Sequence, residues 1–303
     1  MNNIIEIKNL KKTFGDIKAV NDISFDVKEG ELFAFLGQNG AGKSTTISII
    51  CGKLQKDSGD VFVDSKNIDK DIESIKSAIG VVFQHSVLDS QLSVFSNLEH
   101  RAALYGIIGQ DFKEKLEMLS EILELKPLLK RPLGKLSGGQ RRRIDIARAL
   151  IHSPKILILD EPSTGLDPQT RKMIWEVIQK FRKDFGITVF LTTHYMEEAA
   201  ICDNIIILDS GKIAAVGSPH ELKKRYTGDF ITLYGVSEDE VKKLSMPFER
   251  QNESYRVTVP NTSTATELIC KYPEIFHDYE ISKGDMDDVF LAVTGKKLGG
   301  DNK

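Results

Sequence analysis

Cysteine is scarce in this sequence, and long apolar runs are missing from it. The three cysteines, Cys51, Cys202 and Cys270, are too far apart to form a metal-binding spacing such as CxxC. Reduced thiols in a reducing cytosol are the simplest interpretation. No window approaches the roughly 18 uninterrupted apolar residues that a membrane-spanning helix requires. We therefore expect any work at a membrane to be done through a partner protein.

Strong charge of either sign is also lacking. The formal net charge is −3 over 303 residues, which gives no general attraction to nucleic acid. The first residues, Met1–Glu6, have neither the basic start nor the apolar run of a signal peptide, and we expect a cytoplasmic protein. Hydrophobic residues make up 41% and charged residues 28%, which is ordinary for a folded globular chain.

Strand and helix patterns alternate along residues 1–227. Continuous apolar runs at Leu32–Leu36 and Ile156–Leu159 are typical of fully buried strands. Ile23, Phe25 and Val27 alternate with polar residues, as in a half-buried antiparallel strand. Other segments predict further strands at Ile4–Lys8, Val61–Val63, Ile79–Phe83, Thr188–Thr192 and Ile205–Leu208, and a helix at Lys43–Leu54. This alternation predicts a parallel sheet covered by helices.

Residues from about 88 to 150 have a different character. In Asn97–Tyr105 and Phe112–Leu125 the apolar residues recur at helical spacing, and Pro127 ends the second run. The segment is therefore predicted to be a mainly helical insert.

Residues 228–303 form a third pattern. They carry 14 acidic and 9 basic residues, a net −5 against +2 for residues 1–227, and this difference suggests a separate module. Strands and helices are predicted in alternation at Phe230–Tyr234, Glu238–Leu244, Tyr255–Val259, Thr264–Lys271, Asp278–Ser282 and Met286–Val293. The result is a small α/β domain that either stabilises a dimer or binds a regulatory ligand. Its last residues, Gly300–Lys303, are expected to fray.

A glycine-rich segment joins the predicted strand Leu32–Leu36 to the helix that follows. It matches G-x-x-x-x-G-K-[ST], with Gly37, Gln38, Asn39, Gly40, Ala41, Gly42, Lys43, Ser44 and Thr45. Glycines let the loop curl its N–H groups around an anion, and the helix adds its positive N-terminus. Lys43 can reach the β- and γ-phosphates, and the Ser44 hydroxyl can bind Mg²⁺. A plain glycine turn is the alternative, but the strand–helix context favours an NTP site.

A second potential anion-binding segment begins 93 residues after Lys43, at Leu136. Leu136 is followed by Ser137, Gly138, Gly139 and Gln140, which begin a predicted helix that runs to Leu150. A helix start of this kind can bind an anion, although alone it would be an ordinary cap. After a glycine-rich phosphate loop, the segment resembles the signature of ABC-transporter ATPases. The resemblance covers residues 1 to about 225.

The resemblance implies an α/β P-loop NTPase fold. This fold has a RecA-like parallel sheet, an N-terminal antiparallel β subdomain and a helical subdomain inserted at about residues 88–150. It also implies a dimer, because in this family ATP lies between the glycine-rich loop of one subunit and the Leu136–Gln140 segment of the other. ATP and Mg²⁺ are the expected ligands. We place the end of the ATPase domain at residue 227 and the accessory domain at 228–303.

Two carboxylates end the apolar strand Ile156–Leu159, where acidic residues are commonly just solvated. By resemblance, Asp160 holds Mg²⁺ through water, and Glu161 polarises the attacking water as a general base. The segment Ser163–Asp167 resembles the family's loop that couples the two sites of the dimer, and Asp167 is expected among the nucleotide-binding residues.

Three more residues are assigned by resemblance. His194, 33 residues after Glu161, falls at the switch position that contacts the γ-phosphate. Gln84 matches the glutamine that touches Mg²⁺ or the attacking water, and Phe14 falls where an aromatic ring stacks on adenine. A structural histidine, an ordinary glutamine and a core phenylalanine are the alternatives.

The branch of the family is indicated by three weaker segments. Gln84–Asp89, Asn97–Gly106 and Asp285–Gly295 resemble ATPases of ABC-2-type exporters, including the daunorubicin-resistance group. This implies a separate transmembrane permease and a second ATPase subunit, identical or closely related, on the cytoplasmic face of the membrane. Gln38 departs from the proline usual in this group, with little expected effect because the position contributes backbone.

A soluble ABC ATPase without a transport role is the competing hypothesis. Translation-type members carry two such domains in one chain. DNA-repair members carry long coiled coils or zinc-binding cysteines between their motifs, and this sequence has neither. The Leu136–Gln140 segment excludes a generic P-loop kinase. The sequence therefore favours an ATPase that drives export and binds no nucleic acid.

Overall fold

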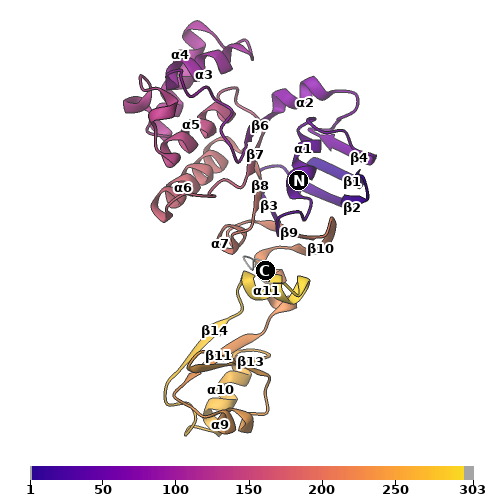
Figure 1. The fold of residues 1–303 in the computed structure, drawn as a ribbon, viewed down its shortest axis with the longest axis vertical. Helices are drawn as coiled ribbons and strands as arrows, with labels where there is room; N and C mark the ends of the chain where they lie inside the picture. The colour runs from indigo at the N-terminus through magenta and orange to yellow at the C-terminus, as the bar shows by residue number, and fades with distance from the viewer. Residues whose placement is uncertain (1, 297–303) are drawn as a thin grey trace. The chain divides into compact units, whose positions relative to one another are not determined.

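The computed structural model describes residues 2–296, and the chain divides into two compact units, Met1–Ala214 and Ala215–Lys303. Figure 1 shows the elements of each unit. The residues Gly300–Lys303, which we expected to fray, lie outside the described range. Within that range, no helix has both the length and the apolar character needed to cross a bilayer.

The first unit begins with an antiparallel sheet. Its strands lie in the order β2-β1-β4-β5 and span Asn3–Phe14 (β1), Ile17–Lys28 (β2), Ser58–Val63 (β4) and Lys66–Asn67 (β5). The predicted alternation is confirmed, since Ile23, Phe25 and Val27 are all buried along β2. β1 pairs along most of its length with β2 and also with β4. For this reason it extends well beyond the predicted Ile4–Lys8.

A six-stranded sheet forms the centre of this unit. Its order is β10-β9-β3-β8-β7-β6, with bounds Leu32–Leu36 (β3), Ile79–Val82 (β6), Ile156–Asp160 (β7), Thr188–Thr193 (β8), Asn204–Asp209 (β9) and Lys212–Gly217 (β10). The five strands from β9 to β6 run parallel, which confirms the predicted parallel sheet. β10 follows β9 after the two-residue turn Ser210–Gly211, in which both φ angles are positive. The carboxyl ends of β3, β8, β7 and β6 therefore meet at one edge.

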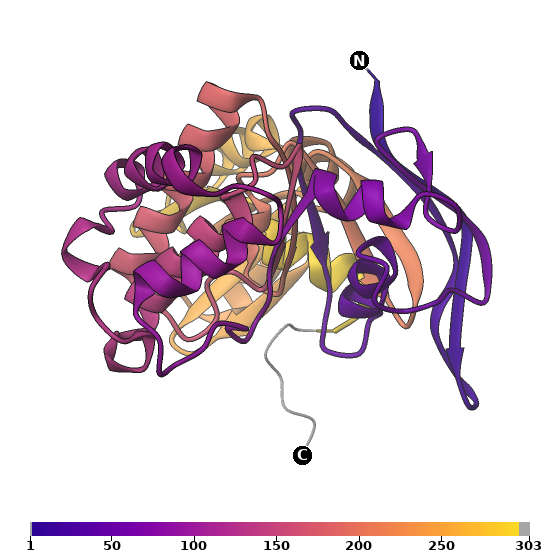
Figure 2. The same ribbon diagram turned by 90° about the horizontal axis from the view of Figure 1, so that it is seen from above.

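Helices cover this parallel sheet. They span Lys43–Ile50 (α1), Ile72–Ala78 (α2), Val94–Ala103 (α3), Gly109–Ile122 (α4), Gly138–Leu150 (α5), Pro168–Phe185 (α6) and Met196–Ala199 (α7). The segment expected to be a helical insert folds into α3, α4, α5 and two short 3-10 turns. This helical segment and the antiparallel sheet lie on opposite sides of the parallel sheet (Figures 1 and 2). α1 ends before the predicted Leu54, and Gly52 follows it at a φ of +66°.

Four phenylalanines join the two sheets of the first unit. The ring of Phe25 in β2 lies 5.0 Å from that of Phe35 in β3, and Phe33 stacks on Phe190 of β8 at 5.3 Å between ring centres. All four are buried. Pairs of buried rings in these geometries stabilise a core beyond their area. The cluster fixes β3, whose end carries the glycine-rich loop.

The second unit is a four-stranded antiparallel sheet with helices. Its strand order is β12-β13-β11-β14, with bounds Asp229–Tyr234 (β11), Phe248–Gln251 (β12), Ser254–Val259 (β13) and Tyr279–Lys283 (β14). Its helices are Pro219–Tyr226 (α8), Glu238–Lys243 (α9), Thr262–Lys271 (α10) and Met286–Thr294 (α11). α9 and α10 pack on the sheet over an apolar core that includes Ile231, Leu233 and Val257.

The helix α11 is anchored to this sheet by one ion pair. Both terminal nitrogens of Arg256 donate to the Asp288 carboxylate, at 2.8 and 2.9 Å, and the guanidinium lies 3.5 Å from the ring centre of Phe230. α8 packs in turn on α11 and buries Leu222. The contacts therefore divide the chain before α8, whereas the sequence placed the end of the ATPase domain after it, at residue 227. The functional boundary stays a prediction.

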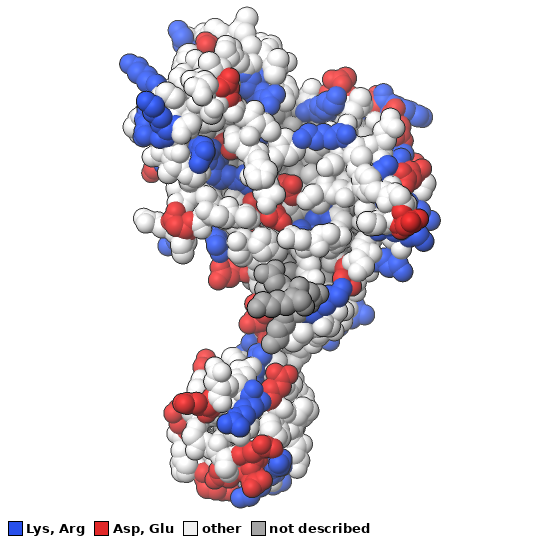
Figure 3. Space-filling model, viewed as in Figure 1, with Lys and Arg blue, Asp and Glu red and all other residues white. Residues whose placement is uncertain are grey.

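Charge is unevenly spread over the second unit. Glu238, Asp239 and Glu240 occupy the first turn of α9, and Figure 3 shows Asp and Glu side chains gathered at the α9 end of the unit. Because three carboxylates favour a helix N-terminus, this acidic surface has a structural explanation.

Two truncations test the division of the chain. A chain ending at Gly217 keeps β10 whole and removes α8, whereas a chain ending at Thr227 keeps α8 without α11 and exposes Leu222. We expect both to fold and to melt cooperatively by circular dichroism, and only the longer one to self-associate in size-exclusion chromatography. If the chain ending at Gly217 aggregates where the full chain is soluble, the second unit belongs to the main core.

Candidate functional site

Most of the predicted site residues follow the carboxyl ends of four neighbouring strands. The glycine-rich loop follows β3, His194 follows β8, Asp160 and Glu161 end β7, and Gln84 lies just beyond β6. Because β3, β8, β7 and β6 are adjacent and parallel, residues from positions 37 to 194 meet at one edge of the sheet. Such an edge is where ligands bind in open α/β sheets.

The glycines of the loop are required by its geometry. Gly40 and Gly42 have φ of +83° and +103°, values that other residues rarely adopt. A Cβ on Gly42 would lie 2.4 Å from the carbonyl oxygen of Ala19, and one on Gly37 would lie 2.6 Å from that of Leu208. The loop is thus packed against β2 and β9. α1 begins directly after it with no side-chain cap and no acidic residue in its first turn, which leaves its N-terminal N–H groups for an anion.

Lys43 places a buried positive charge in this loop. The residue is 4% exposed, and its ammonium donates to the carbonyl oxygens of Gly37 at 2.6 Å and Gln38 at 3.1 Å. Burial lowers the pKa of Lys43, and the negative charges of Glu161 and Asp160 oppose that shift. The loop therefore offers N–H donors, a helix N-terminus and an ammonium at one place, and this set fits a nucleotide phosphate.

Ser44 and Asp160 face each other beside the loop. The Asp160 carboxylate accepts from the Thr192 hydroxyl at 2.6 Å and from the Ser44 hydroxyl at 3.4 Å. A hydroxyl and a carboxylate are ligands that suit Mg²⁺, which usually takes few protein ligands and completes its shell with water and phosphate oxygens. Accordingly, no group of three or more His, Cys, Asp or Glu side chains in residues 2–296 forms a metal site of its own.

The Glu161 carboxylate lies between the side chains of Gln84, Thr164 and His194. One oxygen of its carboxylate accepts from the Gln84 amide at 3.3 Å and from the Thr164 hydroxyl at 3.2 Å, and the other lies 3.6 Å from Nδ1 of His194. Nδ1 of His194 is buried and has no hydrogen-bond partner within the described residues. The structure thus brings together Gln84, Glu161 and His194. They offer an acceptor for a proton and two groups that can hold a ligand beside it.

Ser137 caps the helix α5. Its hydroxyl oxygen accepts from the backbone N–H of Gln140 at 3.2 Å, and the Gln140 side chain accepts from the backbone N–H of Ser137 at 3.1 Å. This is a capping box. Since the oxygen acts as the acceptor, the hydroxyl can still donate to a ligand. A Cβ on Gly139 would lie 2.5 Å from the Thr170 side chain, so the start of α5 packs on the start of α6.

The two anion-binding segments are not joined within one chain. Across residues 2–296, no hydrogen bond or ion pair links Ser137–Gln140 to Gly37–Thr45. Gly138 instead lines a hollow of about 270 Å³ together with Gln84 and Thr164. Within the described residues, Ser137 is therefore not bonded to the glycine-rich loop of its own chain.

Asp167 and Phe14 have simpler surroundings. Asp167 caps α6, where its carboxylate accepts from the Thr170 hydroxyl at 2.6 Å and from the Thr170 N–H at 2.9 Å. Both hydrogen bonds lower the pKa of Asp167, and the bond from the Thr170 hydroxyl has the larger effect. Phe14 is 47% exposed at the end of β1, opposite Ile17, so it is no core residue. Nucleotide contacts by Asp167 and Phe14 remain predictions.

Sequence reasoning missed the polar residues beneath the site. Glu198 is 1% exposed, and its carboxylate accepts from the hydroxyls of Ser163 and Thr193. Thr192 donates to Asp160 and also accepts from the N–H of Glu161. These side chains connect β8 to the segment after β7. The signal in the sequence was the pair Thr192 and Thr193 directly after the apolar run Val189–Leu191.

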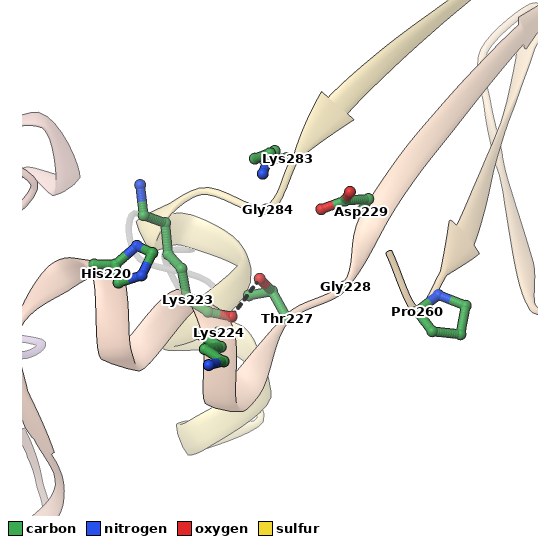
Figure 4. Close-up of a pocket in the computed structure, with 9 residues that line it drawn as sticks. All are labelled: His220, Lys223, Lys224, Thr227, Gly228, Asp229, Pro260, Lys283 and Gly284. Carbon is green, nitrogen blue, oxygen red and sulfur yellow. Dashed lines mark hydrogen bonds between the residues drawn. The ribbon is translucent and has the colours of Figure 1, made fainter. Parts of the chain in front are cut away.

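The second unit contains a separate cavity of about 390 Å³. Figure 4 shows its lining, with His220 and Lys223 on α8 and with Asp229 and Lys283 on β11 and β14. The Thr227 hydroxyl donates to the carbonyl oxygen of Lys223 at 2.8 Å. No residue of the predicted site lines this cavity, so the edge of the parallel sheet is the candidate site.

Comparison with known families agrees with this geometry. A family model described as "ABC transporter" matches residues 20–164. The Nod factor export ATP-binding protein I of Rhizobium sp. (strain N33) is 39% identical, over 97% of this chain and 98% of its own. The linearmycin resistance ATP-binding protein LnrL of Bacillus subtilis is 40% identical, over 78% of this chain and 76% of its own.

Solved structures give the same result for the fold. The cbiO1 protein from Clostridium perfringens, part of the transporter complex cbiONQ, superposes with a TM-score of 0.67 at 32% identity, covering 73% of this chain and 91% of its own. The ATP-binding cassette MJ0796, in a dimeric post-hydrolysis state bound to ADP and phosphate, superposes with a TM-score of 0.65 at 28% identity, covering 71% and 98%.

The cap at Ser137 leads to a prediction about stability. Ser137→Ala removes the acceptor for the Gln140 N–H and should lower the free energy of unfolding of the nucleotide-free protein by roughly 1 kcal/mol. Ser137→Asp should keep the cap and change stability by less than half as much. Urea unfolding followed by circular dichroism measures both. Equal stability of the alanine variant and the wild type would contradict a structural role for the hydroxyl.

Proposed function

Since the chain belongs to the ABC transporter family, as one of its ATP-binding ATPases, we propose that it powers an ABC-2-type exporter whose membrane-spanning part is a separate permease. The observation that carries the proposal is the set of side chains at the edge of the parallel sheet. Lys43 and the loop offer a phosphate site, and Glu161 lies beside it with Gln84 and His194.

The proposed reaction is hydrolysis of ATP. The γ-phosphate is held by Lys43 and the N–H groups of the loop, with the His194 ring beside it. Gln84 orients a water molecule, and Glu161 accepts its proton as the water oxygen bonds to the γ-phosphorus. The bond from that phosphorus to the β,γ-bridging oxygen breaks, giving ADP and phosphate. Ser44, Asp160 and Gln84 would hold Mg²⁺, which would neutralise part of the phosphate charge.

We propose that the site is completed by a second copy of the chain or a close relative. Ser137 caps α5 and keeps a hydroxyl donor, but no hydrogen bond in the described chain brings it to its own glycine-rich loop. In a two-fold dimer the loop of one subunit can meet Ser137 of the partner subunit, and the two sites then form together. The dimeric cassette MJ0796 supports this arrangement.

The proposals of an export role and of a membrane partner are supported by the similarity to the relatives described above. One of these relatives is named for Nod factor export and the other for linearmycin resistance. The permease would place this chain on the cytoplasmic face of the membrane. Leu104 at the end of α3, Ile108 at the start of α4 and Val87 beyond β6 are large, exposed apolar side chains in or next to the helical segment. We propose these side chains as part of the surface that the permease covers.

The proposed general base predicts the behaviour of Glu161→Gln. The amide cannot accept the proton of water, and the hydrolysis rate should fall by about 10² to 10⁴, while ATP binding at Lys43 persists. The bound ATP should then hold two chains together, which light scattering detects as doubling of the mass. A variant that hydrolyses ATP at more than half the wild-type rate removes Glu161 from the mechanism.

The shared site predicts different effects for Ser137 and Lys43. In the dilute monomer, Lys43→Ala should weaken ATP binding because a direct charged contact to phosphate is lost. Ser137→Arg should leave monomer binding near normal and abolish ATP-dependent dimerisation, because a bulky side chain blocks the start of α5. Both variants are titrated with ATP by fluorescence or calorimetry, in the Glu161→Gln background so that hydrolysis does not interfere.

Ser137→Asp is the matched control for this comparison. It keeps the helix cap and places a negative charge against the phosphates of the other subunit, so it should also lose dimerisation without losing monomer binding. If Ser137→Arg and Ser137→Asp, both folded, weaken monomer binding as much as Lys43→Ala does, the serine contributes to its own chain's site. The shared-site arrangement is then wrong.

A further inference from the structure

One buried arginine contacts the backbone of the two segments that carry Gln84 and Glu161, the residues proposed to orient and deprotonate the attacking water. Arg142, five residues after the cap Ser137, is only 7% exposed. Its Nε donates to the carbonyl oxygen of Pro162 at 2.7 Å, and one terminal nitrogen donates to that of Phe83 at 2.5 Å. The other terminal nitrogen donates to the carbonyl oxygens of Glu161 at 3.0 Å and Asp160 at 3.3 Å.

The contacted carbonyls belong to two separate strand ends. Phe83 immediately precedes Gln84 beyond β6, whereas Asp160, Glu161 and Pro162 are consecutive at the end of β7. A guanidinium is planar, with five N–H donors in a fixed fork. One side chain that bonds both strand ends therefore fixes the distance between the backbone of Gln84 and that of Glu161.

Glu161 has a particular need for such support. Its φ of +46° lies in the left-handed region, which costs free energy for a residue with a Cβ and persists where the surroundings hold it. The N–H of Glu161 is held from β8, by the Thr192 carbonyl and hydroxyl at 3.2 and 3.1 Å. Its carbonyl is held from α5 by Arg142. With both sides of the residue fixed, the carboxylate is directed towards Gln84.

The burial of this charge has a cost that packing alone does not explain. Desolvation lowers the pKa of Arg142, and the negative charges of Asp145, Asp160 and Glu198 oppose that shift. An apolar side chain of similar length would fill the same volume without a desolvation penalty. What an apolar side chain cannot supply is a set of donors for four carbonyl groups.

We propose that Arg142 is a positioning residue for hydrolysis, which sets Gln84 and Glu161 relative to each other and ties both to the start of α5. This rests on the proposed function in so far as Gln84 and Glu161 act on ATP. Since Ser137 begins the same helix, the contact of Ser137 with the partner subunit's nucleotide and the position of Glu161 are linked through one rigid element. The alignment of the attacking water therefore depends on the α5 that carries Ser137.

The test replaces the donors while keeping the volume. Arg142→Met should lower kcat at least tenfold and leave the affinity of the monomer for ATP within twofold of wild type, because no contact of Arg142 reaches the glycine-rich loop. Arg142→Lys should have an intermediate kcat, since a single ammonium cannot reach all four carbonyls. It also serves as the second variant if the methionine variant fails to fold.

Arg148→Met is the matched control. Arg148 lies on the same helix, is 6% exposed and donates to the carbonyl oxygen of Val81, the third of the four residues of β6. The Arg148→Met variant removes an equally buried guanidinium whose bond is to β6 itself and not to Phe83 or to residues 160–162. We expect thermal unfolding temperatures to fall similarly in the two variants and kcat of Arg148→Met to stay within twofold of wild type. Equal losses of kcat in the two variants would overturn the proposal and leave Arg142 a structural residue.

A double-mutant cycle separates this inference from the proposed function. If Arg142 acts through Glu161, adding Arg142→Met to Glu161→Gln should change the residual single-turnover rate by less than threefold. An undiminished tenfold loss in that background contradicts positioning through Glu161. If instead the wild type hydrolyses no ATP, or Glu161→Gln retains its rate, the proposed function fails. If Glu161→Gln is slow and Arg142→Met is as fast as wild type, only the inference fails.

Discussion

Parallel backbone hydrogen bonding between β3, β8, β7 and β6 is the constraint on which the site depends. β3, β6 and β7 are mainly apolar, and β8 holds the apolar run Val189–Leu191. A glycine or a polar site residue lies at each strand end or within two residues of it. Because neighbouring parallel strands end at the same edge, the polar ends gather while the apolar parts are buried. The buried phenylalanine cluster around Phe33 and Phe190 packs β3 and β8 against each other within the core. Core and site are therefore two consequences of the same strand pairing.

Beneath the edge of the sheet lies a layer of buried polar side chains. Thr192 contacts Asp160 and Glu161 at the end of β7, whereas Glu198 and Arg142 each contact two segments that carry or adjoin proposed site residues. Each of these groups loses water on burial and regains hydrogen bonds to backbone or side chains. Such networks contribute more to a unique geometry than to net stability. Here they hold Glu161 in a conformation that its own backbone preference disfavours.

Much of the fold was predictable because its signals are local. The apolar runs of β3, β7 and β9 and the spacing in α4 and α10 depend on neighbouring residues alone, and those elements lie within a few residues of their predicted bounds. The sequence missed β12 and β10, which are polar or mixed and form by pairing with β13 and β9. The predicted boundary at residue 227 keeps α8 with the ATPase domain and stays a prediction, although α8 packs on α11, a contact that nothing within Pro219–Tyr226 reveals.

By itself the sequence determined the glycine-rich loop and the cap of α5, because both are short runs whose backbone geometry follows from their own residues. It also determined which side chains could act, from Lys43 to Glu161. Only the tertiary structure decided that Gln84, Glu161 and His194 share one site, and that Ser137 has no bond, among the described residues, to the loop of its own chain. It alone placed Arg142 on four backbone carbonyls of two strand ends. These contacts join residues up to 77 positions apart, and strand order, which no local pattern encodes, brings them together.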